Sequence, residues 1–261
     1  MSYNIYHQSL ESAMLTYSAG ADTNYPVTNL QDRYKNTFFK DTNIGLTEVN
    51  ITIDFWVARS CDYILFWNYL ITLLGDEVIA FIEYSSTGAF SGEQGIATTT
   101  SNLYRLSLGN YLKTFASKSY RYWRLRFYSL GINVKDLQIG AIYLGGQITL
   151  SHSPEINDVY SANYDVNINQ GVGGIRAGSI DNTTVRRIWQ YQWKLLNTTD
   201  KTNLELFRDS IYMNKGLSRY PFIWSPDSGT TLYSARTNGE LSLKQTAFEA
   251  YEWSAVFEEE L

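Results

Sequence analysis

Two histidines and one cysteine are the side chains with the clearest catalytic potential in this 261-residue chain, and their positions argue against catalysis. His7 lies near the N-terminus and His152 lies in a polar stretch, and neither has a triad or ligand partner nearby in the sequence. A zinc site normally uses three or four His, Cys or carboxylate ligands at short spacing, and the chain has no HxxxH or CxxC pattern. We therefore predict no catalytic residue, no metal site and no cofactor.

Paired carboxylates are a second chemical possibility, because a glycoside hydrolase needs only two of them facing each other across a groove. The chain has 26 Asp and Glu residues, but their spacing does not reveal a pair. Asp54, Asp62, Asp76 and Asp136 are interpreted as residues of strand ends and turns. A non-enzymatic protein is the main prediction, with a glycoside hydrolase kept as an alternative.

A glycine-rich segment, Gly171–Gly174, has the composition of a phosphate-binding loop. It lacks the lysine of a P-loop and the helix that should follow one. We interpret it as a hairpin or an extended arm.

Composition and charge exclude several classes of protein. With 44% hydrophobic and 15% aromatic residues, the chain is too apolar to be disordered. The net charge of −5, without a Lys/Arg run longer than two, makes nucleic acid an unlikely main partner. The single Cys61 fits a reducing compartment and a buried, inert thiol. No signal-peptide pattern and no stretch of about 18 apolar residues occurs, so we expect neither export by the usual route nor a membrane-spanning segment.

The elements that would position any site are mainly strands. Apolar and polar residues alternate at 51–56 and at 120–128, and a continuous apolar run covers 63–67. Further strands are expected at 78–84 and 139–144, with a polar loop from 85 to 100. This order predicts an antiparallel β-sandwich at 1–148. A polar stretch at 149–161 suggests the boundary to a second domain at 149–261.

The second domain is predicted to contain strands and one helix. From Arg187 to Leu195 every second residue is expected to share one face, and a last strand covers 247–257 before the acidic residues Glu258 to Glu260, expected to be solvated. Thr202 and Glu205 form a capping-box pattern, with helical spacing behind them and Gly216 as a stop. We therefore predict a mainly β protein with one packed α-helix.

Aromatic side chains are the most plausible binding groups. Trp56, Trp67, Tyr69, Tyr34 and Trp123 belong either to a sugar-stacking site or to the core. In the second domain the choice is between the core and a subunit interface, because tryptophan and tyrosine anchor protein contacts. That second set is Trp189, Trp193, Trp224 and Trp253.

The first part of the chain resembles the galactose-binding-like, discoidin-type jelly roll over about residues 20–147. Four segments carry the resemblance: Tyr25–Leu30 (YPVTNL), Ile51–Phe55 (ITIDF), Tyr63–Asn68 (YILFWN) and Tyr122–Phe127 (YWRLRF). The sugar- or metal-binding loops of that family have no clear counterpart here. The resemblance implies a jelly-roll sandwich for this domain.

The second part resembles tail proteins of long-tailed bacteriophages. The segment Pro221–Asp227 (PFIWSPD), placed after an amphipathic helix, and the aromatic last strand carry this resemblance. It implies a tail-tube-like β-sandwich that forms rings. In many distal tail proteins the ring-forming domain comes first, whereas here it would come second.

The main functional hypothesis is a structural component of a phage tail tip, located in the virion and synthesised in the host cytoplasm. It would form a trimeric or hexameric ring and contact other tail proteins. The expected interface residues are Gly171, Gly173, Ile175, Trp189, Trp193 and Trp224. The alternative is a carbohydrate-binding module for host-surface glycans, with Tyr34, Trp67, Asn68 and Tyr69 as the expected contacts.

Overall fold

The computed structural model describes residues 3–8, 10, 13–18, 22–31, 37–41, 48–72, 78–100, 105–129, 135–154, 159–163, 166–170, 176–180, 186–213, 218–227, 229–238 and 241–260. The chain forms two compact units. We call Tyr6–Gln147 the jelly-roll unit, and Met1–Ile5 together with Ile148–Leu261 the C-terminal unit. The domains expected from the sequence, 1–148 and 149–261, differ from these units at the N-terminus, because Met1–Ile5 belongs to the C-terminal unit.

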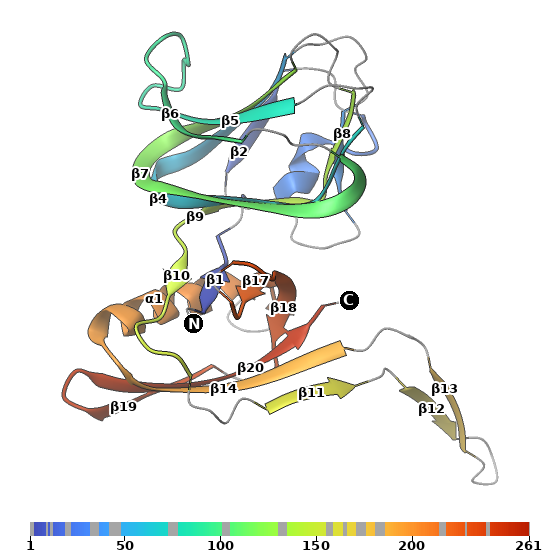
Figure 1. The fold of residues 1–261 in the computed structure, drawn as a ribbon, viewed down its shortest axis with the longest axis vertical. Helices are drawn as coiled ribbons and strands as arrows, with labels where there is room; N and C mark the ends of the chain where they lie inside the picture. Colours follow the sequence, from blue (N-terminus) through green and yellow to red (C-terminus); the bar gives the residue numbers. More distant parts are fainter. Residues whose placement is uncertain are drawn as a thin grey trace. The chain divides into compact units, whose positions relative to one another are not determined.

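The jelly-roll unit is built on an eight-stranded antiparallel sheet (Figure 1). The hydrogen-bonded order is β3-β8-β4-β7-β5-β6, and β2 and β9 pair with β4 outside this path. Its elements are β2 (Met14–Tyr17), the 3₁₀ helix η1 (Val27–Gln31), β3 (Phe39–Lys40), β4 (Glu48–Thr72), β5 (Val78–Ser85), β6 (Gly95–Thr100), β7 (Arg105–Ser129), β8 (Lys135–Ile139) and β9 (Ala141–Gly145).

Strands β4 and β7 span 25 residues each and bend around the core (Figure 1). The first part of β4 pairs with β2 and β7, whereas its last part also pairs with β8 and β9. Bulges interrupt the β4–β7 register, the first of them between Asp54 and Arg59. Such bulges bend a strand and increase its twist. The two strands expected at 51–56 and 63–67 are therefore one bent strand.

Alternation along the strands separates the core from the solvent-facing side of the sheet. Trp123 and Leu125 on β7 are fully buried, while Arg124 and Arg126 lie on the opposite face. Burying an apolar side chain of this size stabilises the fold by about 1.5–3 kcal/mol. The alternation predicted for residues 120–128 is confirmed.

One predicted loop contains a strand. Residues 85–100 were expected to form a polar loop, but Gly95–Thr100 forms β6 and pairs with β5. Its sequence, GIATTT, has β-branched residues at most positions, which suits a pleated strand despite its low hydrophobicity.

The C-terminal unit contains a second eight-stranded sheet, in the order β10-β1-β17-β18-β20-β14-β11, with β19 paired to β20 (Figure 1). The N-terminal strand β1 therefore lies inside a sheet whose other strands follow residue 147. The sheet strands are β1 (Asn4–Tyr6), β10 (Ile148–Thr149), β11 (Val159–Asn163), β14 (Arg186–Leu196), β17 (Phe222–Ser225), β18 (Tyr233–Thr237), β19 (Ser242–Ala247) and β20 (Ala250–Glu259). Two hairpins are formed by β12 (Val166–Gln170) with β13 (Arg176–Ile180) and by β15 (Tyr212–Met213) with β16 (Ser218–Arg219).

The helix α1 (Thr198–Ile211) begins one turn earlier than predicted. Its N-cap is Asn197, whose side chain accepts a 2.9 Å hydrogen bond from the Asp200 N–H. The Asn197 N–H in turn donates to the Asp200 carboxylate at 3.2 Å. This reciprocal pair satisfies the N–H groups of Asn197 and Asp200 and forms the capping box, so the capping role expected for Thr202 and Glu205 is wrong.

The apolar stripe of α1 packs into the core of the C-terminal unit. Leu204, Phe207 and Ile211 are all buried, as their helical spacing predicted. The described helix ends at Ile211, and Gly216, expected as the stop, lies outside the described residues. With this helix, the predicted mainly β class with one α-helix is confirmed for the described chain.

A bulge changes the face of one residue on β14. Trp189, Tyr191 and Trp193 are buried, but Leu195 is 68% exposed, against the expectation that it shares their face. The register of β14 with β20 shifts between Trp193 and Leu196, and Leu195 has a positive φ of 59°. The backbone turn brings Leu196 into the core instead.

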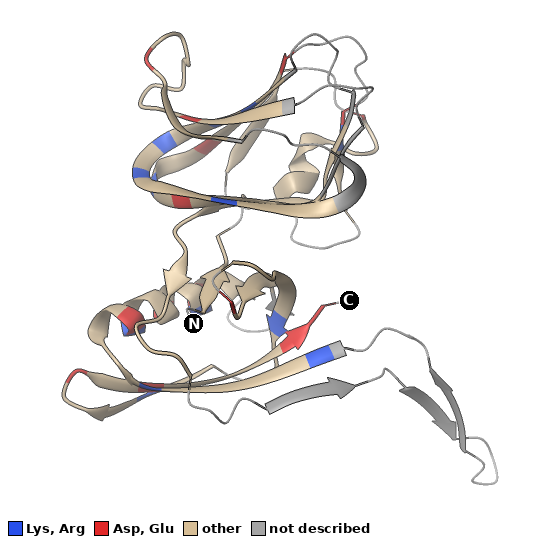
Figure 2. Ribbon diagram, viewed as in Figure 1, with Lys and Arg blue, Asp and Glu red and all other residues tan. Residues whose placement is uncertain are grey.

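The acidic end of β20 is paired rather than simply solvated. Figure 2 shows its red segment beside the blue segments of β14 and β18. Arg187 donates to Glu259 at 3.0 Å, and Arg236 pairs with Glu260. The side chains of Glu259 and Glu260 are only 14% and 17% exposed, so these ion pairs link the end of β20 to β14 and β18.

The buried thiol of Cys61 gives a test of the jelly-roll core. Its side chain is fully buried, and this burial raises its pKa. Because the thiolate is the reactive form, we expect no modification of the native protein by a thiol reagent at mildly alkaline pH, and complete modification after denaturation. Intact-mass spectrometry measures both states. Rapid labelling of the native protein would contradict this packing.

Candidate functional site

A surface corner forms where β4 bulges against β7. Asp54 pairs with Tyr122, but the next pair is Arg59 with Tyr120, so Arg121 alone lies opposite the four intervening residues of β4. Of these four residues, Phe55 is buried in the core, whereas Trp56 and Val57 are exposed. We call the group Asp54, Trp56, Val57, Arg121 and Tyr122 the Trp56 corner.

Trp56 is held in an unusual backbone conformation at this corner. Its φ is 66°, in the left-handed region that bulky residues rarely adopt. Such a conformation costs about 1–3 kcal/mol and persists only where surrounding contacts impose it. The Asp54 carboxylate accepts a 2.7 Å hydrogen bond from the Trp56 N–H. The result is an indole that is 57% exposed, beside Val57 at 70%.

The same carboxylate orients a guanidinium group. Arg121 Nε donates to Asp54 Oδ1 and Arg121 Nη2 donates to Oδ2, both at 2.7 Å. The Asp54 side chain is 7% exposed and the Arg121 side chain 38%. Within the described residues Nη1 makes no hydrogen bond, so the outer edge of a fixed guanidinium remains available. The arginine lowers the pKa of Asp54, and the Trp56 N–H lowers it further.

Aromatic rings surround this guanidinium. Its carbon lies 4.7 Å from the centroid of the Tyr122 ring and 5.9 Å from the centroid of the Trp56 ring. Cation–π contacts of this kind restrict the arginine further. The corner thus presents an indole, an oriented cation and a phenol ring over a small area.

The β5–β6 connection supports Tyr122 from the other side. Gly88 has a φ of +83°, and a Cβ atom at this position would lie 2.9 Å from the Tyr122 ring. Glu93 closes the connection by accepting hydrogen bonds from the hydroxyl groups of Ser85 at 2.7 Å and Thr87 at 2.8 Å. These contacts lower the pKa of Glu93. A glycine is required where the connection meets the ring.

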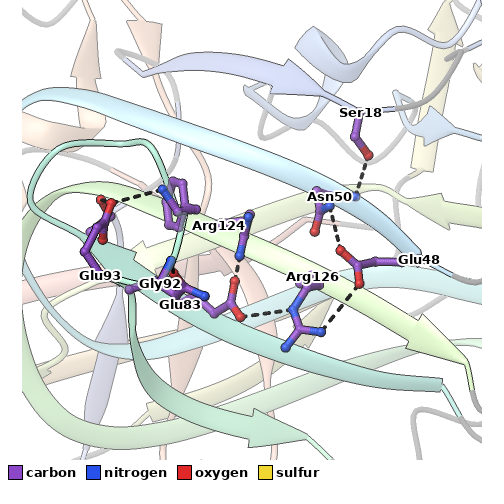
Figure 3. A network of polar contacts seen from close by, with 11 residues as sticks. Ser18, Glu48, Asn50, Glu83, Gly92, Glu93, Arg124 and Arg126 are labelled. Atoms are coloured by element: carbon purple, nitrogen blue, oxygen red, sulfur yellow. Dashed lines mark hydrogen bonds and ion pairs between the residues drawn. The ribbon is translucent and has the colours of Figure 1, made fainter.

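An ordered set of charges lies across β4, β5 and β7 (Figure 3). Glu83 is 1% exposed and accepts from Arg124 at 2.6 Å and from Arg126 at 3.0 Å. Arg126 also pairs with Glu48 at 3.5 Å. Arg124 lies over the Phe90 ring. Two cations and two carboxylates therefore compensate each other and form a rigid polar floor.

Of the predicted glycan-binding residues, the side chains of Trp67 and Asn68 lie in the described part of the chain. Trp67 is buried, at 7% exposure, so its ring is not available for stacking. Asn68 has a φ of 50°, and its N–H donates to the Asn110 side chain at 3.0 Å. Tyr34 lies outside the described residues, as does the side chain of Tyr69. The apolar run around Trp67 reflects core packing.

The predicted interface residues fall into two groups: three buried tryptophans, and three residues that lie outside the described part of the chain. Trp193 and Trp224 are fully buried, and Trp189 is 7% exposed, all within the core of the C-terminal unit. Their rings pack against one another and against neighbouring aromatic rings. Core packing therefore accounts for the spacing of these tryptophans along the sequence, without a contact to another subunit. Gly171, Gly173 and Ile175 lie outside the described residues.

A Ser–His–Asp group occurs near α1 but has the wrong order for nucleophilic catalysis. Ser151 Oγ donates a hydrogen bond to the Asp200 carboxylate, and His152 Nδ1 lies 2.9 Å from Ser151 Oγ. A catalytic relay needs the histidine between serine and aspartate. Here the serine is in the middle, and its own N–H also donates to Asp200 at 3.2 Å. The group links residue 151 to the first turn of the helix.

Within the described part of the chain, no group of three His, Cys, Asp or Glu residues is arranged to hold a metal ion. None of the described helices is long and apolar enough to cross a membrane.

Sequence reasoning included Trp56 among the possible stacking residues but did not distinguish it from buried tryptophans. A signal was present, because the alternation of β4 fails at Trp56, where Val57 and Ala58 follow without a turn residue. Arg121 is 67 positions from its ion-pair partner Asp54, so a short window of sequence contained no signal for this pair.

No protein-family model matches the chain, and no match is found among curated proteins. Solved structures do show similarity. A chitosan-binding module of a Paenibacillus chitosanase/glucanase is 14% identical with a TM-score of 0.43, covering 54% of this chain and 100% of the module. A Clostridium perfringens carbohydrate-binding module in complex with GalNAc-β-1,3-galactose is 10% identical with a TM-score of 0.42, covering 53% of this chain and 100% of the module. A Ruminococcus gnavus fucosidase in complex with fucose is 16% identical with a TM-score of 0.43, covering 55% of this chain and 28% of the enzyme.

These structural neighbours are carbohydrate-binding modules or parts of glycoside hydrolases. None of these three structures is a phage tail protein.

The Asp54–Arg121 pair predicts a specific acid response. The pKa of Asp54 in the folded protein lies below its ordinary value of about 3.9. The contribution of this pair is therefore present at neutral pH and is lost as the pH falls through the folded pKa. We expect the indole N–H resonance of Trp56 to be constant above pH of about 5 and to shift at strongly acidic pH.

An Asp54→Asn variant is the matched control, since it keeps the shape but removes the charge. Its Trp56 resonance should resemble the acid form already at neutral pH. A wild-type shift centred well above the ordinary aspartate range would show that another group controls the corner.

Proposed function

We propose that the jelly-roll unit is a non-catalytic carbohydrate-recognition domain and that the Trp56 corner is its binding surface. The observation that carries this proposal is the exposed Trp56 indole, held at positive φ beside a guanidinium whose outer edge is available. Strained and exposed aromatic residues are costly to maintain for folding alone.

The chemistry of the corner matches a sugar. The C–H face of a sugar ring stacks on an indole, which offers a large and rigid apolar surface. The outer edge of the Arg121 guanidinium donates to two adjacent oxygens, such as neighbouring hydroxyl groups. Because Asp54 already compensates the charge of Arg121, a neutral ligand leaves no ion unpaired.

The same geometry supports binding rather than hydrolysis. Glycoside hydrolysis needs a proton donor and a second carboxylate, about 5–10 Å apart. At the corner, Asp54 is ionised and fully engaged by Arg121 and Trp56, and the nearby Glu83 is buried between two arginines. Both carboxylates act as structural anchors.

Binding to a glycan array followed by calorimetry on the bound glycans tests this proposal. We expect Trp56→Ala to weaken binding at least about tenfold. Stacking of a nucleic-acid base on an aromatic side chain is worth about 1–3 kcal/mol, and we expect a sugar ring stacked on this indole to contribute a similar free energy. Arg121→Lys should also weaken binding, because it keeps the charge but removes the planar fork.

The matched controls are Ile96→Ala, which removes another exposed apolar residue of this unit, and Arg208→Gln, which removes an exposed arginine of α1. Both should bind like the wild type, and every variant should remain folded at the temperature of the binding measurement. If Trp56→Ala binds glycans as tightly as the wild type, the binding site does not include the Trp56 corner. Absence of binding to any glycan would refute the proposal.

We further propose that the C-terminal unit is an assembly module, as in a ring-forming tail-tip component of a bacteriophage virion. Support comes from Phe248, which is 87% exposed in the turn between β19 and β20. The exposed Leu195 lies on β14, which is paired with β20 in the same region as β19. Leu196 of β14 and Gln245 of β19 both pair with Tyr251 of β20. Large apolar side chains exposed on the same sheet favour a protein contact.

Light scattering coupled to size exclusion tests this assembly. We expect a trimer or hexamer whose dissociation is promoted by Phe248→Ser, with Val57→Ser in the jelly-roll unit as a control that keeps the wild-type mass. A protein that stays monomeric across the accessible concentrations would contradict self-assembly.

A further inference from the structure

The outer face of the C-terminal sheet carries a hollow that neither proposed activity uses. It lies over β14, β20 and β19 and has a volume of about 330 Å³, at the lower end of the range for small-molecule sites. Its lining consists of Gln190, Tyr191, Gln192, Ser242, Ser254, Ala255 and Val256.

The strand register explains why the surface is hollow here. Gln192 on β14 pairs with Ser254 on β20, which in turn pairs with Ser242 on β19. Two short serine side chains therefore follow a long glutamine across the sheet. In the next row Gln190 pairs with Val256. The glutamines form the wall, and the serines with Val256 form the floor.

The polar groups of this hollow are available to a ligand. Within the described residues, the side chains of Gln190, Ser242 and Ser254 make no hydrogen bond. Gln192 differs, since its amide nitrogen donates to Glu252, which fixes the orientation of its carbonyl oxygen. A carboxamide and two hydroxyl groups thus offer both donors and acceptors, beside one oriented acceptor.

The lining restricts the class of ligand. It contains no charged side chain, and the adjacent Glu252 is a carboxylate, so an anionic ligand would lose hydration without gaining a counter-charge. A purely apolar ligand would leave the amides and hydroxyl groups unpaired. The hollow also lies on the face of the sheet, over β14, β20 and β19, whereas a peptide strand would add to the outer edge of β19, which pairs only with β20 among the described strands.

We propose that this hollow is a second ligand site, which binds a small neutral saccharide presenting hydroxyl and acetamido groups. The acetamido N–H and C=O complement the glutamine carboxamides, the hydroxyl groups pair with Ser242 and Ser254, and Val256 contacts a C–H face. Without an aromatic platform, the affinity is expected in the millimolar range.

Heteronuclear NMR of the full chain, with the side-chain amide signals of Gln190 and Gln192 as reporters, tests the site. The probe is N,N′-diacetylchitobiose, and glucuronate serves as the charged comparison. The titration is made on the Trp56→Ala variant as well as on the wild type, so the result does not depend on the jelly-roll site.

We expect saturable shifts of both glutamine amides with the neutral probe in both proteins and no saturable shift with glucuronate. Ser254→Val and Ser242→Val fill the floor and should each weaken binding at least fivefold. Thr246→Val, an exposed position on β19 outside the hollow, should leave it unchanged.

Three results would overturn the proposal. They are the absence of saturable shifts with the neutral probe, equal binding of glucuronate, and undiminished binding by both serine variants.

Discussion

The pairing of β4 with β7 is the constraint on which the jelly-roll unit depends. Two strands of 25 residues supply the centre of its sheet, and the remaining strands attach to them or to β5 and β8. Strands of this length cannot stay straight around a small core, because each strand carries a right-handed twist. Bulges absorb the bend, and the first of them creates the Trp56 corner. The proposed binding surface is thus a consequence of how the sheet turns.

Charge compensation allows polar groups to sit on this sheet without weakening it. Asp54 is shared between Arg121 and the Trp56 N–H, and Glu83 is shared between Arg124 and Arg126. A buried carboxylate without such partners would be strongly destabilising. Because each of these ions is fixed by at least two contacts, the surface is pre-organised, which reduces the entropy lost when a ligand binds.

The C-terminal unit obeys a different constraint, which concerns chain order. Its sheet contains β1 between β10 and β17, so the strand at residues 4–6 must pair with segments that follow the whole jelly-roll unit. Closing so long a loop costs entropy before any contact compensates for it. The aromatic core around Trp193, Trp224 and Trp253 supplies much of the burial that offsets this cost.

The sequence by itself determined the mainly β class, the alternation around Trp123, the apolar face of the helix and the burial of Cys61, because these depend on local periodicity and composition. It did not determine which tryptophans are exposed, since a core ring and a binding ring have the same spacing along a strand. Only the tertiary structure decided that Trp67 and Trp193 are buried while Trp56 is exposed. The physical reason is that bulges and long-range pairs, such as Asp54 with Arg121, set the orientation of a side chain, and neither is encoded within a short window of sequence.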